Sequence, residues 1–165
     1  MFGDTTDPRD RRSVERRDDV LVYSTEPLEE DVEVTGSAEL TLYASSSAPD
    51  TDFTGTLVDV HPNGKAIIIT EGIVRARFRE SYEEPTLIEP GQVYEYRFRL
   101  WETSNLFKAG HRIRLEVSSS NFPRFDRNQN TGHQPGMDAE VQVARQTIYH
   151  DADHPSQITL PVIPR

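Results

Sequence analysis

Apolar and polar residues alternate along most of the chain with the two-residue period that is typical of half-buried β-strands. The clearest run covers residues 38–44, in which Ala38, Leu40, Leu42 and Ala44 occupy every second position. Further extended segments are expected at residues 20–25, 53–61, 66–70, 73–79, 94–101, 111–117, 140–149 and 157–162. The pattern therefore predicts a protein built from many short strands.

Glycine and proline mark the connections between these segments. Residues 62–65 read Pro-Asn-Gly-Lys and predict a hairpin, with Asn63 and Gly64 supplying the two positive φ angles of a type I′ turn. The Glu71-Gly72 pair interrupts an extended segment and predicts a β-bulge. Residues 83–91 form a proline-punctuated connection that ends in a Pro-Gly turn.

Helical periodicity is weak throughout. No window shows apolar residues spaced as on one face of a helix, and residues 103–108 are expected to hold one helical turn at most. Many strands, Gly/Pro punctuation and long crossovers together favour an all-β fold, an antiparallel β-sandwich of the jelly-roll kind.

Composition narrows the classes of function. A chain of 165 residues is most simply one domain, and no apolar run approaches the length of a membrane span. A net charge of -10 argues against a nucleic-acid partner, and the lack of cysteine excludes disulfides, thiol catalysis and thiolate-bound zinc. The N-terminus lacks the basic and apolar regions of a secretory signal. We expect a soluble, cytoplasmic chain, although composition alone does not fix its location.

The first residues differ from the rest of the chain. Residues 4–19 mix aspartate and arginine with almost no apolar side chain beyond Val14. Such a segment offers too little apolar surface to offset its ordering entropy. We therefore predict a linker at residues 1–17, disordered or draped over a partner, and a sandwich domain at residues 18–165.

The longest break in the alternation is the segment 118–132, which directly follows a predicted strand. It carries amides, a proline, two phenylalanines and two arginines, and it suits neither helix nor strand. Two interpretations are open. Phe122 and Phe125 pin a long surface crossover whose amides cap its turns, or the loop is a recognition surface carried on a rigid scaffold.

Catalytic and metal-binding patterns are weak. The Gly-x-Ser-x-Gly turn of many serine hydrolases does not occur, so no catalytic residue is assigned. Metal ligands are conceivable at residues 150–154, at Asp59 with His61, and for calcium at Asp50 with Asp52. Ordinary turn hydrogen bonding explains such side chains equally well. We predict no metal site and no cofactor.

Aromatic side chains could form a platform on which a sugar stacks, but the two-residue period of the strand argues against it. Trp101 follows Tyr94 and Tyr96 along one predicted strand, yet strict alternation places the tryptophan on the opposite face from the tyrosines. Aromatic residues in strands more often pack in a core or between domains.

Several motifs carry a family likeness. The segments 18–28, 57–64, 70–77, 108–115 and 119–132, which include Val-Asp-Val-His-Pro-Asn-Gly and Ser-Ser-Asn-Phe-Pro-Arg-Phe, occur in the family's order. The chain resembles the C-terminal domain of the cocaine esterase / X-Pro dipeptidyl-peptidase (CocE/NonD) family of serine hydrolases over residues 12–164. The resemblance implies a non-catalytic, galactose-binding-like jelly-roll domain that belongs to an α/β-hydrolase-type enzyme.

The same resemblance implies a partner. The catalytic Ser-His-Asp set of the family lies in an α/β-hydrolase domain, and none of these residues can be carried onto this chain. We expect this chain to pack on that domain and support its active-site pocket, with a homodimer left open and no nucleic-acid or membrane partner. The alternative is a stand-alone carbohydrate-binding β-sandwich. Candidate interface residues are Asn121, Phe122, Pro123, Arg124, Phe125, Asp126, Asn130, Arg99 and Trp101.

Overall fold

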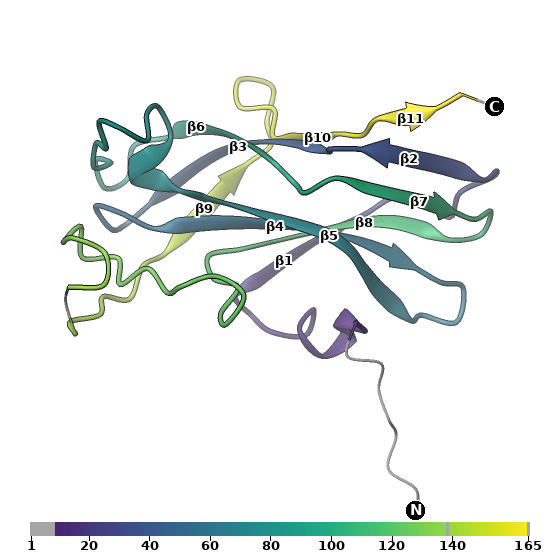
Figure 1. Cartoon of the computed structure of the whole chain (residues 1–165), viewed down its shortest axis with the longest axis horizontal. Helices are drawn as coiled ribbons and strands as arrows, with labels where there is room; N and C mark the ends of the chain where they lie inside the picture. The colour runs from purple at the N-terminus through teal and green to yellow at the C-terminus, as the bar shows by residue number, and fades with distance from the viewer. Residues whose placement is uncertain (1–8, 138, 165) are drawn as a thin grey trace, which may run out of the picture.

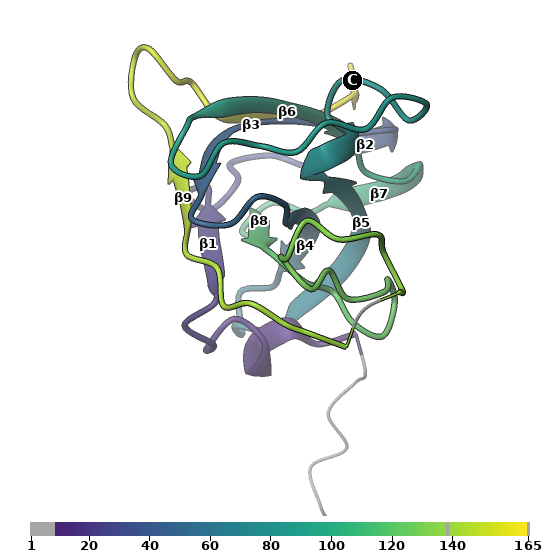
Figure 2. The same ribbon diagram turned by 90° about the vertical axis from the view of Figure 1, so that its left-hand side faces the viewer.

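Two antiparallel β-layers lie face to face in the computed structural model (Figures 1 and 2), which describes residues 9–137 and 139–164. The first layer is a four-stranded sheet with the order β1-β8-β4-β5. Its strands are β1 (Val20–Ser24), β8 (Arg112–Ser118), β4 (Asp52–Val60) and β5 (Ala66–Arg75).

The second layer consists of a four-stranded sheet and a three-stranded sheet placed end to end. Their orders are β10-β3-β6 and β11-β2-β7, and β9 also pairs with β3. The chain runs from β2 into β3 and from β6 into β7 after short breaks, which makes the two sheets halves of one layer (Figure 1). The strands are β2 (Val32–Gly36), β3 (Glu39–Ser46), β6 (Tyr94–Arg99), β7 (Thr103–Phe107), β9 (Gln146–Tyr149), β10 (Gln157–Thr159) and β11 (Val162–Ile163).

The core lies between the two layers and follows the predicted alternation. Leu40 and Leu42 of β3 are buried, and they face Leu57 of β4 within one apolar cluster. Tyr96 of β6 is fully buried, with its ring 4.7 Å from that of Phe53. Removing such side chains from water is the main driving force for folding. The predicted all-β antiparallel sandwich is thus confirmed.

Residues 9–19 lie against the outer face of the first sheet. A short 3₁₀ turn, η1 (Arg11–Ser13), places Arg11 beside Glu116 with an Nη2–Oε2 distance of 2.7 Å. Asp10 forms an isolated bridge with Ile67 of β5. The linker predicted at residues 1–17 therefore packs, over its described part from residue 9, on the sandwich of its own chain. Residues 1–8 lie outside the described residues.

The hairpin between β4 and β5 is present, but the predicted type I′ turn is wrong. The amide of Gly64 donates to the carbonyl of His61 at 2.8 Å, and the amide of His61 donates to the carbonyl of Lys65 at 2.8 Å. The loop therefore has three residues, with Gly64 at a φ of 83°. The reason is Pro62, because a type I′ turn at Asn63 and Gly64 would need Pro62 to donate an N–H that proline lacks.

Two further local features are now defined, a strand that was not predicted and the position of the β-bulge. Residues 103–108 hold no helical turn, since Thr103–Phe107 forms β7 and pairs with β2 from Val32 to Gly36. The register shift in β5 lies opposite Leu57 and Val58, not at Gly72. Gly72 is required by close packing instead, since a Cβ there would lie 2.4 Å from the carbonyl oxygen of Arg99.

Candidate functional site

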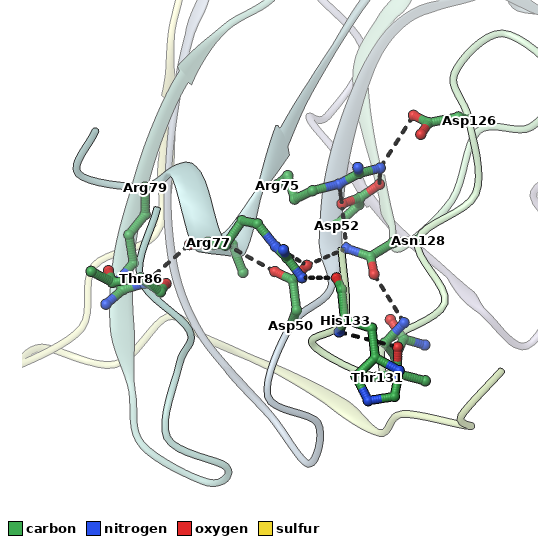
Figure 3. A network of polar contacts seen from close by, with 12 residues as sticks. Asp50, Asp52, Arg75, Arg77, Arg79, Thr86, Asp126, Asn128, Thr131 and His133 are labelled. Atoms are coloured by element: carbon green, nitrogen blue, oxygen red, sulfur yellow. Dashed lines mark hydrogen bonds and ion pairs between the residues drawn. The ribbon is translucent and has the colours of Figure 1, made fainter. Parts of the chain in front are cut away.

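The loop after β8 lies at the end of the sandwich where β4 begins and β5 ends (Figure 2). Polar contacts with the start of β4 and the end of β5 hold it there (Figure 3). Nδ2 of Asn128 lies 3.0 Å from Oδ2 of Asp50 and 2.8 Å from Oδ1 of Asp52. Since Asp50 is fully buried and Asp52 almost so, one loop amide reaches into the interior.

Two arginines complete this network. Arg75 binds Asp52 through both Nε and Nη2, at 2.8 and 3.1 Å. Nε of Arg77 lies 2.8 Å from Oδ2 of Asp50, and its Nη2 donates to the carbonyl of His133 at 2.8 Å. The buried carboxylates are therefore paired with charged donors, as burial of a charge requires.

Burial and hydrogen bonding shift the pKa values of Asp52 and Arg75. Loss of solvation raises the pKa of Asp52, while hydrogen bonds from Arg75 and Asn128 act in the opposite direction. The hydrogen bonds to Asp52 raise the pKa of Arg75 further above its usual range. Because guanidinium and amide donors occupy both carboxylates, the oxygens of Asp50 and Asp52 are not arranged as a calcium site.

Asn130 and Asp126 also anchor the loop. Asn130 has a φ of 64°, and its backbone amide donates to Oδ1 of Asn128 at 2.9 Å. Its own Nδ2 donates to the carbonyl of Gln142. Oδ1 of Asp126 lies 3.2 Å from Nη2 of Arg75. The structure thus gives Asn130 a role in shaping the loop, and Asp126, although exposed, also ties it to β5.

Glu71 of β5 joins the loop to the connection between β6 and β7. Its carboxylate accepts from Nδ2 of Asn121 at 2.6 Å and from Nε of Arg124 at 3.1 Å. Its carbonyl accepts from the backbone amide of Trp101 at 3.1 Å. One residue of β5 therefore binds two segments that are distant from it in sequence, the loop after β8 and the connection between β6 and β7. Sequence reasoning missed Glu71, because it interpreted the Glu71-Gly72 pair only as a bulge.

These contacts create an exposed aromatic and cationic surface, the Trp101 surface, made of Trp101, Asn121, Phe122, Pro123 and Arg124. Cζ of Arg124 lies 4.4 Å from the centroid of the Trp101 ring. Trp101 is 56% exposed and Phe122 is 62% exposed, which is unusual for large aromatic side chains. Tryptophan, phenylalanine and arginine are enriched at protein–protein interfaces.

Two residues of the predicted interface, Phe125 and Arg99, are not part of the Trp101 surface. Phe125 is half-buried, with Cζ of Arg124 5.9 Å from its ring centroid. Arg99 is exposed and pairs with Glu39 of β3 at 3.9 Å. The Phe122–Pro123 peptide bond is cis.

A second exposed apolar feature was not anticipated from the sequence. The first strand, at the edge of its sheet, exposes Leu21, Val22 and Tyr23 in succession. Beside it a groove of about 470 Å³ opens between the layers. We call this feature the β1 groove; its lining is mostly apolar and includes Tyr23, Leu42, Ile113, Leu115, Ile148 and Ile158.

A group of three potential metal ligands occurs at one place among the described residues. Ligand atoms of Asp59, His61 and His111 lie within 4.8 Å of one another. The other predicted cluster does not converge, since His154 bonds Asp151 and the ring of His150 lies against Tyr23. The described part of the chain contains no helix long and apolar enough to cross a membrane.

The sequence matches a family model, the X-Pro dipeptidyl-peptidase C-terminal non-catalytic domain, over residues 4–159. The chain belongs to this family. As a CocE/NonD-type non-catalytic domain it is 52% identical over 163 residues to cocaine esterase from Rhodococcus sp. (strain MB1 Bresler). That alignment covers 96% of this chain and 28% of the esterase. The predicted resemblance is confirmed.

Solved structures agree with this assignment. An aminopeptidase from a marine sediment Thaumarchaeota archaeon matches with a TM-score of 0.89 and 35% identity, over 94% of this chain and 27% of that one. An α-amino acid ester hydrolase matches with a TM-score of 0.86, 35% identity and the same coverage. This non-catalytic domain thus spans about a quarter of the length of its relatives.

Proposed function

We propose that this domain packs on an α/β-hydrolase catalytic domain of the same parent protein and supports the active-site pocket of a serine hydrolase. The parent would cleave esters or amides through an acyl-serine intermediate, which needs a base-activated nucleophile and an oxyanion hole. The observation that carries the proposal is the Trp101 surface, where exposed aromatic side chains are held in place by buried polar anchors.

Pre-organisation is the first argument. The loop that presents Phe122 is tied to β5 through Glu71 and to buried carboxylates through Asn128. A side chain that is already ordered loses little conformational entropy when a partner binds. A surface crossover with no partner would not need such anchoring, so the contacts favour the recognition interpretation of the loop.

The β1 groove supplies a second argument. Leu21 and Tyr23 are exposed on the groove side of β1, and with the apolar groove they form a patch of the kind that marks protein contacts. The relatives are about four times as long as this chain, so each has further protein that can cover such a patch. We infer that the catalytic domain contacts the Trp101 surface and that the groove extends this contact or receives a second copy of the chain.

The carbohydrate-binding alternative is less well supported. A sugar platform needs a free aromatic face, but the guanidinium of Arg124 lies over the ring of Trp101. Tyr96 is fully buried, and the hydroxyl of Tyr94 accepts from the amide of Glu89. Titration against a glycan array separates the alternatives, because a sugar module would bind without any catalytic domain.

Hydrogen exchange tests the proposed packing. The catalytic domain encoded by the same gene, recognised by an in-frame Gly-x-Ser-x-Gly, is added to this chain and amide exchange is followed by mass spectrometry. Slower exchange at residues 99–102 and 119–127 is expected. Unchanged exchange in both segments, at concentrations where the two proteins co-sediment, would overturn the assignment of the surface.

A further inference from the structure

We propose that Asp59, His61 and His111 form a binding site for a divalent first-row transition metal such as Zn²⁺. Nδ1 of His111 lies 2.8 Å from Oδ1 of Asp59, and Nε2 of His61 lies 3.8 Å from Oδ2 of the same carboxylate. The two imidazole rings lie 4.4 Å apart, centroid to centroid. Two imidazoles and one carboxylate are ligands that zinc accepts.

The sheet register places the three residues together. Asp59 lies near the end of β4 and His61 directly follows the strand, two residues further on, so their side chains point to the same face. Val60 pairs with Arg112 of β8, and the next residue on each side, His61 and His111, therefore lie opposite each other. Asp59 lies within β4, and the two histidines directly adjoin the paired ends of β4 and β8, which restricts their movement.

The ligand atoms already lie close to the spacing that a metal requires. Ligand atoms about 2.0 Å from a tetrahedral metal lie about 3.3 Å from one another. The three groups are within 4.8 Å, and the Asp59–His61 distance of 3.8 Å is already near that value. Asp59 is almost fully buried and His111 is largely so, whereas His61 remains partly open to solvent. A metal can therefore enter from the His61 side.

The surroundings leave room for a fourth ligand. A cleft of about 370 Å³ is lined by Asp59 and His61 together with Thr103 and Asn105 of β7. Nδ2 of Asn105 is buried and finds no hydrogen-bond acceptor among the described residues. That donor suits a water or small anion held on the metal. Lys65 also lines the cleft and adds positive charge, so binding weaker than in a closed cysteine-rich site is expected.

The test is a Zn²⁺ titration of the metal-free 165-residue chain by calorimetry, repeated with Co²⁺ to follow its visible absorption. One equivalent should bind with a Kd on the order of micromolar, with affinity falling in acid because protons compete for the imidazoles. His61→Ala, at a partly exposed position, should fold normally and weaken binding by at least about tenfold.

Matched variants keep the test decisive. His154→Ala removes another histidine that bonds an aspartate, and its affinity should equal that of the parent chain. Asp59→Asn keeps the shape of the side chain and should also lose tight binding. The proposal is overturned if the parent chain binds no stoichiometric Zn²⁺, if His61→Ala binds as tightly as the parent, or if His154→Ala is the variant that loses affinity.

Discussion

The guanidinium of Arg124 lies over Trp101, with Cζ 4.4 Å from the ring centroid, while Nε of the same side chain lies 3.1 Å from Oε1 of Glu71. One arginine thus ties the long loop both to β5 and to the link between β6 and β7. The contact leaves Trp101 ordered but still exposed. It is the structural basis for proposing that this surface meets a partner.

Replacing Arg124 by alanine should uncover the tryptophan. A partly exposed cation–π contact is worth about 0.5–1 kcal/mol, so little global stability is lost, while the Trp101 ring becomes more accessible. Trp101 is the single tryptophan of the chain, so acrylamide quenching of its fluorescence reports this directly. Arg127→Ala, which removes the cation over Phe122, serves as the control and should leave quenching unchanged. Equal quenching of Arg124→Ala and the parent chain would refute the contact.

Removing Arg77 should strongly destabilise the fold. The variant Arg77→Ala leaves the fully buried carboxylate of Asp50 without its charged partner, which costs about 3–5 kcal/mol. The free energy of unfolding in urea measures the loss. Arg97→Ala breaks an exposed pair with Glu95 and should change stability by less than about 1 kcal/mol. Similar losses in the two variants would contradict the importance of the buried pair.

Gly72 should tolerate no side chain. An alanine Cβ would lie 2.4 Å from the carbonyl oxygen of Arg99, and that backbone cannot move without disturbing β6, of which Arg99 is the last residue. Overpacking of this kind costs about 1–3 kcal/mol, measurable by thermal unfolding. Gly136→Ala, where a Cβ meets nothing within 4 Å, is a useful comparison for steric cost, although its φ of 75° adds strain. Wild-type stability in Gly72→Ala would show that the two segments are farther apart.

The Asp10 carboxylate should lose its stabilising effect in acid. Hydrogen bonds from the side chain and backbone of Arg12 lower the pKa of Asp10 from its ordinary value of 3.8 to about 2. A lowered pKa means that the carboxylate stabilises the fold above about pH 3.8 and loses this effect as the pH falls through about 2. The difference in unfolding free energy between the parent chain and Asp10→Asn should therefore shrink as acid is added. A difference that stays constant with pH would contradict this linkage.

Much of the layer structure could be predicted from the sequence, because strands that bury one face show alternating apolar and polar residues. The run from Ala38 to Ala44 and the opposed faces of Tyr96 and Trp101 follow that rule. Residues 103–107 did not reveal their strand, since Thr-Ser-Asn-Leu-Phe has little alternation and extends only through pairing with β2. Asn63 and Gly64 alone favour a type I′ turn, but Pro62 lacks the N–H that this turn requires.

The candidate site was only partly predictable. The loop was identified by the composition of residues 118–132, but its anchors depend on side chains brought together by the fold. Asn121 meets Glu71 across 50 positions, and Asn128 meets Asp50 across 78 positions. One sequence signal was available. Arg75 and Arg77 have the same two-residue spacing as Asp50 and Asp52, and this matched spacing is consistent with two paired strand ends.

The most direct measurement is the affinity of the catalytic domain for this chain and its Phe122→Asp variant, determined by analytical ultracentrifugation or calorimetry. We expect Phe122→Asp to weaken association by at least about tenfold, because a charge replaces an exposed aromatic anchor. Ile163→Asp, on a different strand and equally non-conservative, should bind like the parent chain. An unchanged Kd for Phe122→Asp, with binding lost in Leu21→Lys instead, would move the contact to the β1 groove and contradict its assignment to the Trp101 surface.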